Sequence, residues 1–122
     1  MLGVTILTSI KDAAVERMYH VPTARKVMEL SRDAVSAGLL GVVSSPLEVG
    51  MIKNDPETSS LFAMIPGTRS ASADTQDQAR VGTPAAAIAD GADLLVIGRQ
   101  VTQAEDPELA YLQLVAEIEG AL

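Results

Sequence analysis

The sequence contains no cysteine and no tryptophan, and only one histidine, one phenylalanine and two tyrosines. Without cysteine there is no disulfide and no thiolate metal site, and His20 alone cannot form a histidine metal cluster. The net charge is −7 and no basic cluster occurs, which argues against a nucleic-acid surface or a basic membrane-binding face. There is no signal-peptide pattern and no apolar run long enough to span a membrane. We therefore expect a soluble cytoplasmic protein without metal or cofactor, in which any anionic ligand needs a local cationic pocket.

Because aromatic residues are scarce, the core must be built from aliphatic side chains and methionine, and 48% of the residues are hydrophobic. Four short aliphatic runs are nearly continuous, whereas a strand with one solvated face would alternate. Each run is therefore predicted to be a buried parallel strand. The four runs are residues 2–8, 39–44, 61–65 and 93–97.

Between the predicted strands, capping residues followed by proline predict helices that begin near Pro46, Pro84 and Pro107. A longer helix is predicted over residues 23–37, before Gly38, and the helix from Pro84 should stop before Gly91. Tyr19 and His20 are expected in a surface turn. The last helix is expected to bury a stripe formed by Leu109, Leu112, Val115, Ile118 and Leu122.

The alternation of strands and helices predicts a single α/β domain over residues 1–122. Two architectures fit. One is a small open sheet with helices on both faces, and the other is a (βα)4 half of a TIM-type (βα)8 barrel, with parallel strands and outer helices. Composition alone does not choose between them. Residues 66–82 form the one long irregular segment, which is expected to be functional or disordered.

Gly98-Arg99 follows the fourth predicted strand. The glycine would let a backbone N–H approach an anion, and the arginine could bind phosphate with two hydrogen bonds. In (βα)8 barrels the loops after the last two strands often bind phosphate. The alternative is a glycine that ends the strand, followed by a solvated arginine.

Two further strand ends carry polar groups. Pro66-Gly67-Thr68-Arg69 follows the third run and leads to Asp77-Gln78-Ala79-Arg80-Val81, a chemistry suited to a loop that folds over a phosphate ester, or to an ordinary surface loop. Thr8 and Ser9 follow the first run, where their hydroxyls could bind a ligand, although helix capping is the simpler explanation.

Together these segments resemble bacterial orotidine 5'-monophosphate decarboxylases, in this order and over essentially the whole chain. The combination of Pro-Gly-x-Arg, Asp-Gln-x-Arg-Val and Ile-Gly-Arg is specific, whereas Gly-Arg alone occurs in many phosphate-binding barrels. The segments that carry the resemblance are Thr5-Ile6-Leu7-Thr8-Ser9, Gly41-Val42-Val43-Ser44-Ser45-Pro46, Ile65-Pro66-Gly67-Thr68-Arg69, Asp77-Gln78-Ala79-Arg80-Val81 with Thr83-Pro84, and Ala92-Asp93-Leu94-Leu95-Val96-Ile97-Gly98-Arg99.

The resemblance implies a role for each matching position. Arg99 and the Gly98 amide would hold the 5'-phosphate of a pyrimidine nucleotide, and Arg69 would line the phosphate end of the site. Gln78 would reach from the loop to the phosphate and the pyrimidine. The ring itself would lie near Thr8, Ser9 and Pro66.

The family's catalytic Asp-x-Lys-x-x-Asp motif does not occur in this sequence. The resemblance therefore implies the phosphate-binding half of the decarboxylase, aligned with strands five to eight, without catalytic residues and inactive alone. The alternatives are an enzyme that is active only with a separate N-terminal half, and a self-associating structural half-barrel without activity. A fragment of another phosphosugar-binding barrel, such as a hexulose-phosphate synthase, fits the Asp-Gln-x-Arg-Val segment poorly.

A half-barrel would leave its inner sheet face open and its first and last strands unpaired. Two copies related by a two-fold axis could close one eight-stranded barrel and cover both faces. We therefore expect a homodimer. The alternative partner is a separate N-terminal half of the barrel.

Overall fold

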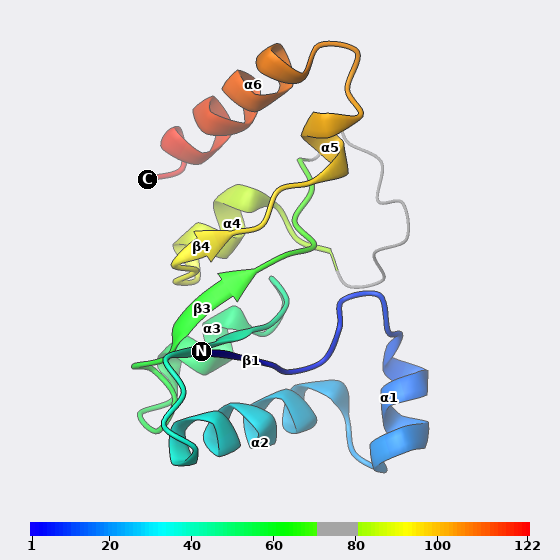
Figure 1. Cartoon of the computed structure of the whole chain (residues 1–122), viewed down its shortest axis with the longest axis vertical. Coiled ribbons are helices and arrows are strands. Elements are labelled where there is room, and N and C mark those ends of the chain that lie inside the picture. The colour runs from blue at the N-terminus through cyan, green and yellow to red at the C-terminus, as the bar shows by residue number, and fades with distance from the viewer. Residues whose placement is uncertain (71–80) are drawn as a thin grey trace.

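The computed structural model describes residues 1–70 and 81–122. In this part of the chain one sheet has the strand order β1-β2-β3-β4, and every neighbouring pair is parallel (Figure 1). The four predicted strands are thus confirmed, although each is shorter than its aliphatic run. The strands are β1 (Leu2–Val4), β2 (Gly41–Val43), β3 (Phe62–Ile65) and β4 (Leu94–Leu95).

The strands are short because the chain leaves the regular ladder before each run ends. Single hydrogen bonds continue beyond it: the Thr5 amide donates to the Val43 carbonyl over 3.0 Å, and the Val96 amide donates to the Ile65 carbonyl over 2.9 Å. The carboxyl ends of the runs therefore stay beside one another as irregular segments, free to carry polar side chains.

Six helices lie in the described residues. Helices α2, α4 and α6 are confirmed. Gly38 and Gly91 follow the ends of α2 and α4 with left-handed φ values of 70° and 101°, and α4 and α6 begin at Pro84 and Pro107. The helices are α1 (Asp12–Tyr19), α2 (Thr23–Ser36), α3 (Val49–Asn54), α4 (Pro84–Ala89), α5 (Arg99–Thr102) and α6 (Pro107–Glu119).

Two local predictions need correction. The helix expected from Pro46 begins at Val49, because the Glu48 amide bonds to the Ser45 carbonyl in a tight turn and the Ser45 hydroxyl meets the Glu48 carboxylate. The residues before the predicted surface turn form α1, a helix that no sequence pattern indicated. Tyr19 ends that helix and His20 caps it with φ 58°.

The core lies between the sheet and the helices on one of its faces. Val42 and Ala63 point to this side and are almost fully buried. The buried core residues are Ile6, Val15, Val27, Ala34, Val42, Ile52 and Leu61 in one cluster, and Val49, Ala63, Ile65, Ala87 and Ala92 in a second.

The opposite face of the sheet carries one apolar residue from each strand in a single row, here called the inner row: Val4, Val43, Met64 and Leu94 are paired in register. No described helix covers this row, and Val4 and Leu94 are 58% and 44% exposed. The structure therefore has helices on one side only, as in half of a barrel, and the alternative of helices on both faces is wrong.

The stripe predicted for α6 is largely wrong. Leu109, Leu112 and Leu122 are exposed, and Leu114 is the side chain that α6 buries. In the described part of the chain the helix packs mainly on α4 and α5 (Figure 1). Leu109 and Leu112 stay exposed, although they are spaced as a buried stripe would be.

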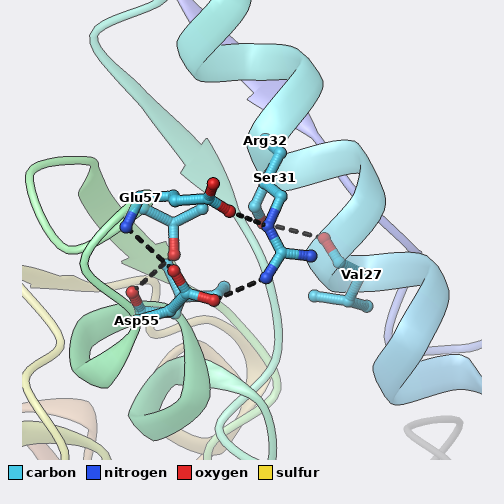
Figure 2. A network of polar contacts seen from close by, with 7 residues as sticks. Val27, Ser31, Arg32, Asp55 and Glu57 are labelled. Carbon is cyan, nitrogen blue, oxygen red and sulfur yellow. Dashed lines mark hydrogen bonds and ion pairs between the residues drawn. The ribbon is translucent and has the colours of Figure 1, made fainter.

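A polar network joins α2 to the segment between α3 and β3 (Figure 2). The Arg32 guanidinium lies 2.6 Å from both the Asp55 and the Glu57 carboxylates, and hydrogen bonds from it to Glu57 and Asp55 raise its pKa. The Glu57 amide donates to the Asp55 carboxylate, which together with Arg32 lowers the pKa of Asp55.

Among the described residues, no helix is long and apolar enough to cross a membrane.

Candidate functional site

The polar strand ends meet at one rim of the sheet, because all four strands are parallel. Thr8 follows β1, Ser44 follows β2, Thr68 and Arg69 follow β3, and Arg99 follows β4. This rim collects the predicted site residues that the structure describes. Gln78 was also predicted to bind the ligand, and it lies outside the described residues.

The segment after β3 is held by its backbone. Gly67 has a left-handed φ of 79°, so the chain turns directly after Pro66. Thr68 then forms a parallel bridge with Gly82, and the Arg69 amide donates to the Gly82 carbonyl over 3.0 Å. Residues far apart in the sequence thus fix the position of Arg69.

Arg69 is buried, with only 6% of its surface exposed. Its Nη1 donates to the Thr68 carbonyl over 2.7 Å, and its Nε is buried with no hydrogen-bond partner. No carboxylate pairs with it among the ion pairs of the described residues. A buried cation without an anion is costly, so this geometry favours an anionic ligand.

Gly98 and Arg99 stand at the end of the β4 segment, where α5 begins. The Gly98 carbonyl accepts hydrogen bonds from the Val101 and Thr102 amides, at 2.9 and 3.1 Å. A Cβ atom added to Gly98 would meet no atom of the described residues within 4 Å, which leaves space beside this backbone for a ligand. Arg99 is half-buried in the first turn of α5, rather than in a solvated loop.

Gln100 is a rim residue that sequence reasoning missed. Its side-chain Oε1 accepts a hydrogen bond from the Ser70 amide at 3.3 Å, which links α5 to the segment after β3. Its Nε2 is buried without a partner, like the Ser44 and Thr68 hydroxyls. The sequence held no sign of this, because the contact joins residues 30 positions apart.

Thr8 and Ser9 form a turn after β1, closed by a 3.0 Å hydrogen bond from the Ile10 amide to the Leu7 carbonyl. Thr8 is 6% exposed, whereas Ser9 is exposed. Neither caps α1: the N-cap residue is Lys11, and no side chain caps that helix. Helix capping therefore does not explain the two hydroxyls.

An ion pair of Lys53 and Asp93 lies at the other end of the sheet. The Lys53 Nζ is 2.6 Å from the Asp93 Oδ2, which also accepts a 2.8 Å hydrogen bond from the Ala63 amide. Desolvation acts to raise the pKa of Asp93, but the Ala63 and Lys53 contacts outweigh it and lower the pKa. The pair joins α3 to the start of β4 and stands away from the rim.

Comparisons with known proteins place the chain in a family. The model of the orotidine 5'-phosphate decarboxylase / HUMPS family matches residues 1–114. The chain is 43% identical over 122 residues to the orotidine 5'-phosphate decarboxylase of Ruegeria pomeroyi, covering 97% of this chain and 50% of that protein. It is 44% identical over 120 residues to the enzyme of the same name from Thermobifida fusca, covering 96% of this chain and 50% of that protein.

A solved structure agrees with the sequence comparison. The crystal structure of orotidine 5'-phosphate decarboxylase from Lactobacillus acidophilus matches with a TM-score of 0.73 and 34% sequence identity, over 96% of this chain and 48% of that chain. The chain spans about half the length of the curated relatives that it matches. It therefore belongs to the orotidine 5'-phosphate decarboxylase / HUMPS family and has the fold of half a TIM-type (βα)8 barrel.

Proposed function

We propose that this chain binds the 5'-phosphate of a pyrimidine nucleotide and is the phosphate-binding half of an orotidine 5'-phosphate decarboxylase in uridine monophosphate synthesis. The observation that carries the proposal is Arg69, a buried guanidinium without a carboxylate partner among the described residues. A phosphate would supply the missing charge and accept the unused hydrogen bond of its Nε.

The other ligand contacts come from the same rim. The open space beside Gly98 supports a backbone contact to a phosphate oxygen, and Arg99 follows it directly. Thr8, buried at the end of the β1 segment and not used as a helix cap, supports a role near the pyrimidine. The full proposed ligand-binding set is Thr8, Ser9, Pro66, Arg69, Gln78, Gly98 and Arg99.

We propose that the isolated chain does not decarboxylate. Phosphate contacts bind substrate and transition state alike, whereas rate acceleration needs groups that favour the transition state. The Asp-x-Lys-x-x-Asp motif is absent from the sequence, and the Lys53–Asp93 pair lies at the opposite end of the sheet. Turnover would then need a partner that carries the catalytic groups.

For the assembly, we propose that a second copy closes the barrel. Within residues 1–70 and 81–122 the inner row is apolar and uncovered, and β1 and β4 each pair with a single strand, which leaves one edge of each open. A two-fold axis along the barrel would place β1 of one copy beside β4 of the other and cover both inner rows. A separate N-terminal half would occupy the same place as the second copy. Mixing the chain with such a half and measuring decarboxylation distinguishes the two partners, because only the N-terminal half would produce turnover.

We also propose a cytoplasmic location, in keeping with the lack of cysteine.

Calorimetry with uridine monophosphate and with uridine tests the binding proposal. The two ligands differ only in the phosphate, so we expect measurable binding of the nucleotide and much weaker binding of the nucleoside. Equal affinity for the two ligands would contradict the proposal.

A further inference from the structure

Gln100 has a side chain that is held at one end and unused at the other. Its Oε1 accepts the Ser70 amide hydrogen at 3.3 Å. An N–H group needs an acceptor, so this contact fixes which side-chain atom is the oxygen and which is the nitrogen. The Nε2 amide, a double donor, is then the other branch of the side chain, buried and without a partner among the described residues.

The segment that Gln100 contacts carries further buried polar groups. Ser70 directly follows Thr68 and Arg69, whose Oγ1 and Nε are buried without partners among the described residues. All three groups can donate a hydrogen bond, and none of the ion pairs in residues 1–70 and 81–122 brings a carboxylate to them. Buried donors left unsatisfied are costly, and acceptor oxygens of a ligand are the groups that would satisfy them.

We propose that Gln100 is an additional phosphate-binding residue of this chain, which donates a hydrogen bond from Nε2 to an oxygen of the bound anion. Its Oε1, held by the Ser70 amide, aims the donor and joins the Arg69 segment to the helix that begins at Arg99. This inference rests on the proposed phosphate site and extends it by a residue outside the motifs that identified the site.

Two substitutions separate the proposed Nε2 contact to the ligand from the Oε1 contact with the Ser70 amide. Gln100→Ala removes both the acceptor for Ser70 and the donor for the ligand. Gln100→Glu keeps an acceptor for Ser70 but replaces the donor by a negative charge. If Nε2 faces the anion, uridine monophosphate affinity should fall at least about tenfold in Gln100→Ala and further in Gln100→Glu, with uridine affinity unchanged in both. Thermal stability should follow the opposite order, with Gln100→Glu above Gln100→Ala.

Gln103→Ala is the matched control, because Gln103 is exposed just after α5. The ¹⁵N amide resonance of Ser70 reports the Oε1 contact independently of any ligand, and it should shift in Gln100→Ala and stay near its position in Gln100→Glu. If Gln100→Glu restores both stability and nucleotide affinity, Gln100 is only structural and the inference is wrong. If the unmodified chain binds the nucleotide and the nucleoside equally, the proposed phosphate site itself fails, and this inference fails with it.

Discussion

Gly41 lies opposite Phe62 in the parallel ladder of β2 and β3, so close that a Cβ atom on Gly41 would overlap the Phe62 carbonyl and lie 2.7 Å from its Cβ. The neighbour is backbone in a central strand pair, which cannot move aside as a flexible side chain would. Only glycine therefore fits at this position without moving one strand away from the other.

Gly41→Ala should accordingly lower the free energy of unfolding by about 1–3 kcal/mol or more. Gly50→Ala is the control. Gly50 lies in α3, and the nearest atoms to a Cβ added there belong to Asp90, at ordinary contact distances. That change should be neutral or stabilising by up to roughly 1 kcal/mol, through higher helix propensity. Urea unfolding of both variants, at one protein concentration, measures the two effects. A Gly41→Ala variant as stable as the parent chain would contradict the steric argument.

Arg69→Met should weaken phosphate-dependent binding while stabilising the unliganded protein. A charge-assisted contact to phosphate contributes on the order of 1.5–3 kcal/mol, so nucleotide affinity should fall about 10- to 100-fold. Replacing a buried guanidinium that has no carboxylate partner among the described residues by an apolar side chain of similar length removes a desolvation cost. Calorimetry and thermal unfolding give the two values.

Arg99→Ala should cause a similar loss of affinity without the gain in stability, since Arg99 is only half-buried. Arg17→Ala, which removes one exposed positive charge from α1, controls for net charge and should leave binding unchanged. If both site variants bind the nucleotide as the parent chain does, the two arginines have no role in the phosphate site.

The inner row predicts the assembly. Light scattering should give twice the mass of the chain, and the double substitution Val4→Lys and Leu94→Lys should give a monomer, because it places charges on the face that a second copy would cover. Leu122→Lys is the control, since Leu122 is 85% exposed at the end of the chain. A monomeric parent chain, or a dimer that survives the double substitution, would refute closure through this face.

The Lys53–Asp93 ion pair should make the free energy of unfolding decrease at low pH. The pKa of Asp93 is lowered in the folded chain, so its contribution is present above its unfolded pKa of roughly 3.9 and is lost as the pH falls through the lower folded value. The parent chain should therefore be more stable than Asp93→Asn at pH 7, with the difference shrinking below about pH 4. Urea unfolding at several pH values measures this difference. A difference that stays constant over this pH range for Asp93→Asn would contradict the role of the pair.

Local chemistry made much of the fold predictable. Aliphatic runs located all four strands, and proline at helix starts with glycine after helix ends located α2, α4 and α6 within a few residues. Both kinds of pattern depend on neighbours in the sequence. Helix α1 was missed because it buries a single residue, Val15, and so lacks a wide apolar stripe.

Features that depend on distant contacts were not predictable. A continuous aliphatic run does not reveal which residues face helices, so the sequence could not separate Val42, in the core, from Val43, in the inner row. The burial of Arg69 depends on the bridge between Thr68 and Gly82, and the orientation of Gln100 depends on Ser70. The motifs thus supplied the predicted site residues, while the arrangement of the donors without partners among the described residues needed the structure.

The strand order has a consequence for how the chain acquires its fold during synthesis. Each strand pairs only with strands next to it in the sequence, and the contacts that join them are of modest span: 38 residues separate Thr5 from Val43, and 30 separate Ala63 from Asp93. Every new βα unit can therefore dock on the one made just before it, without waiting for a later strand to be inserted between earlier ones. Such sequential pairing allows the sheet to grow in the order in which the ribosome releases it.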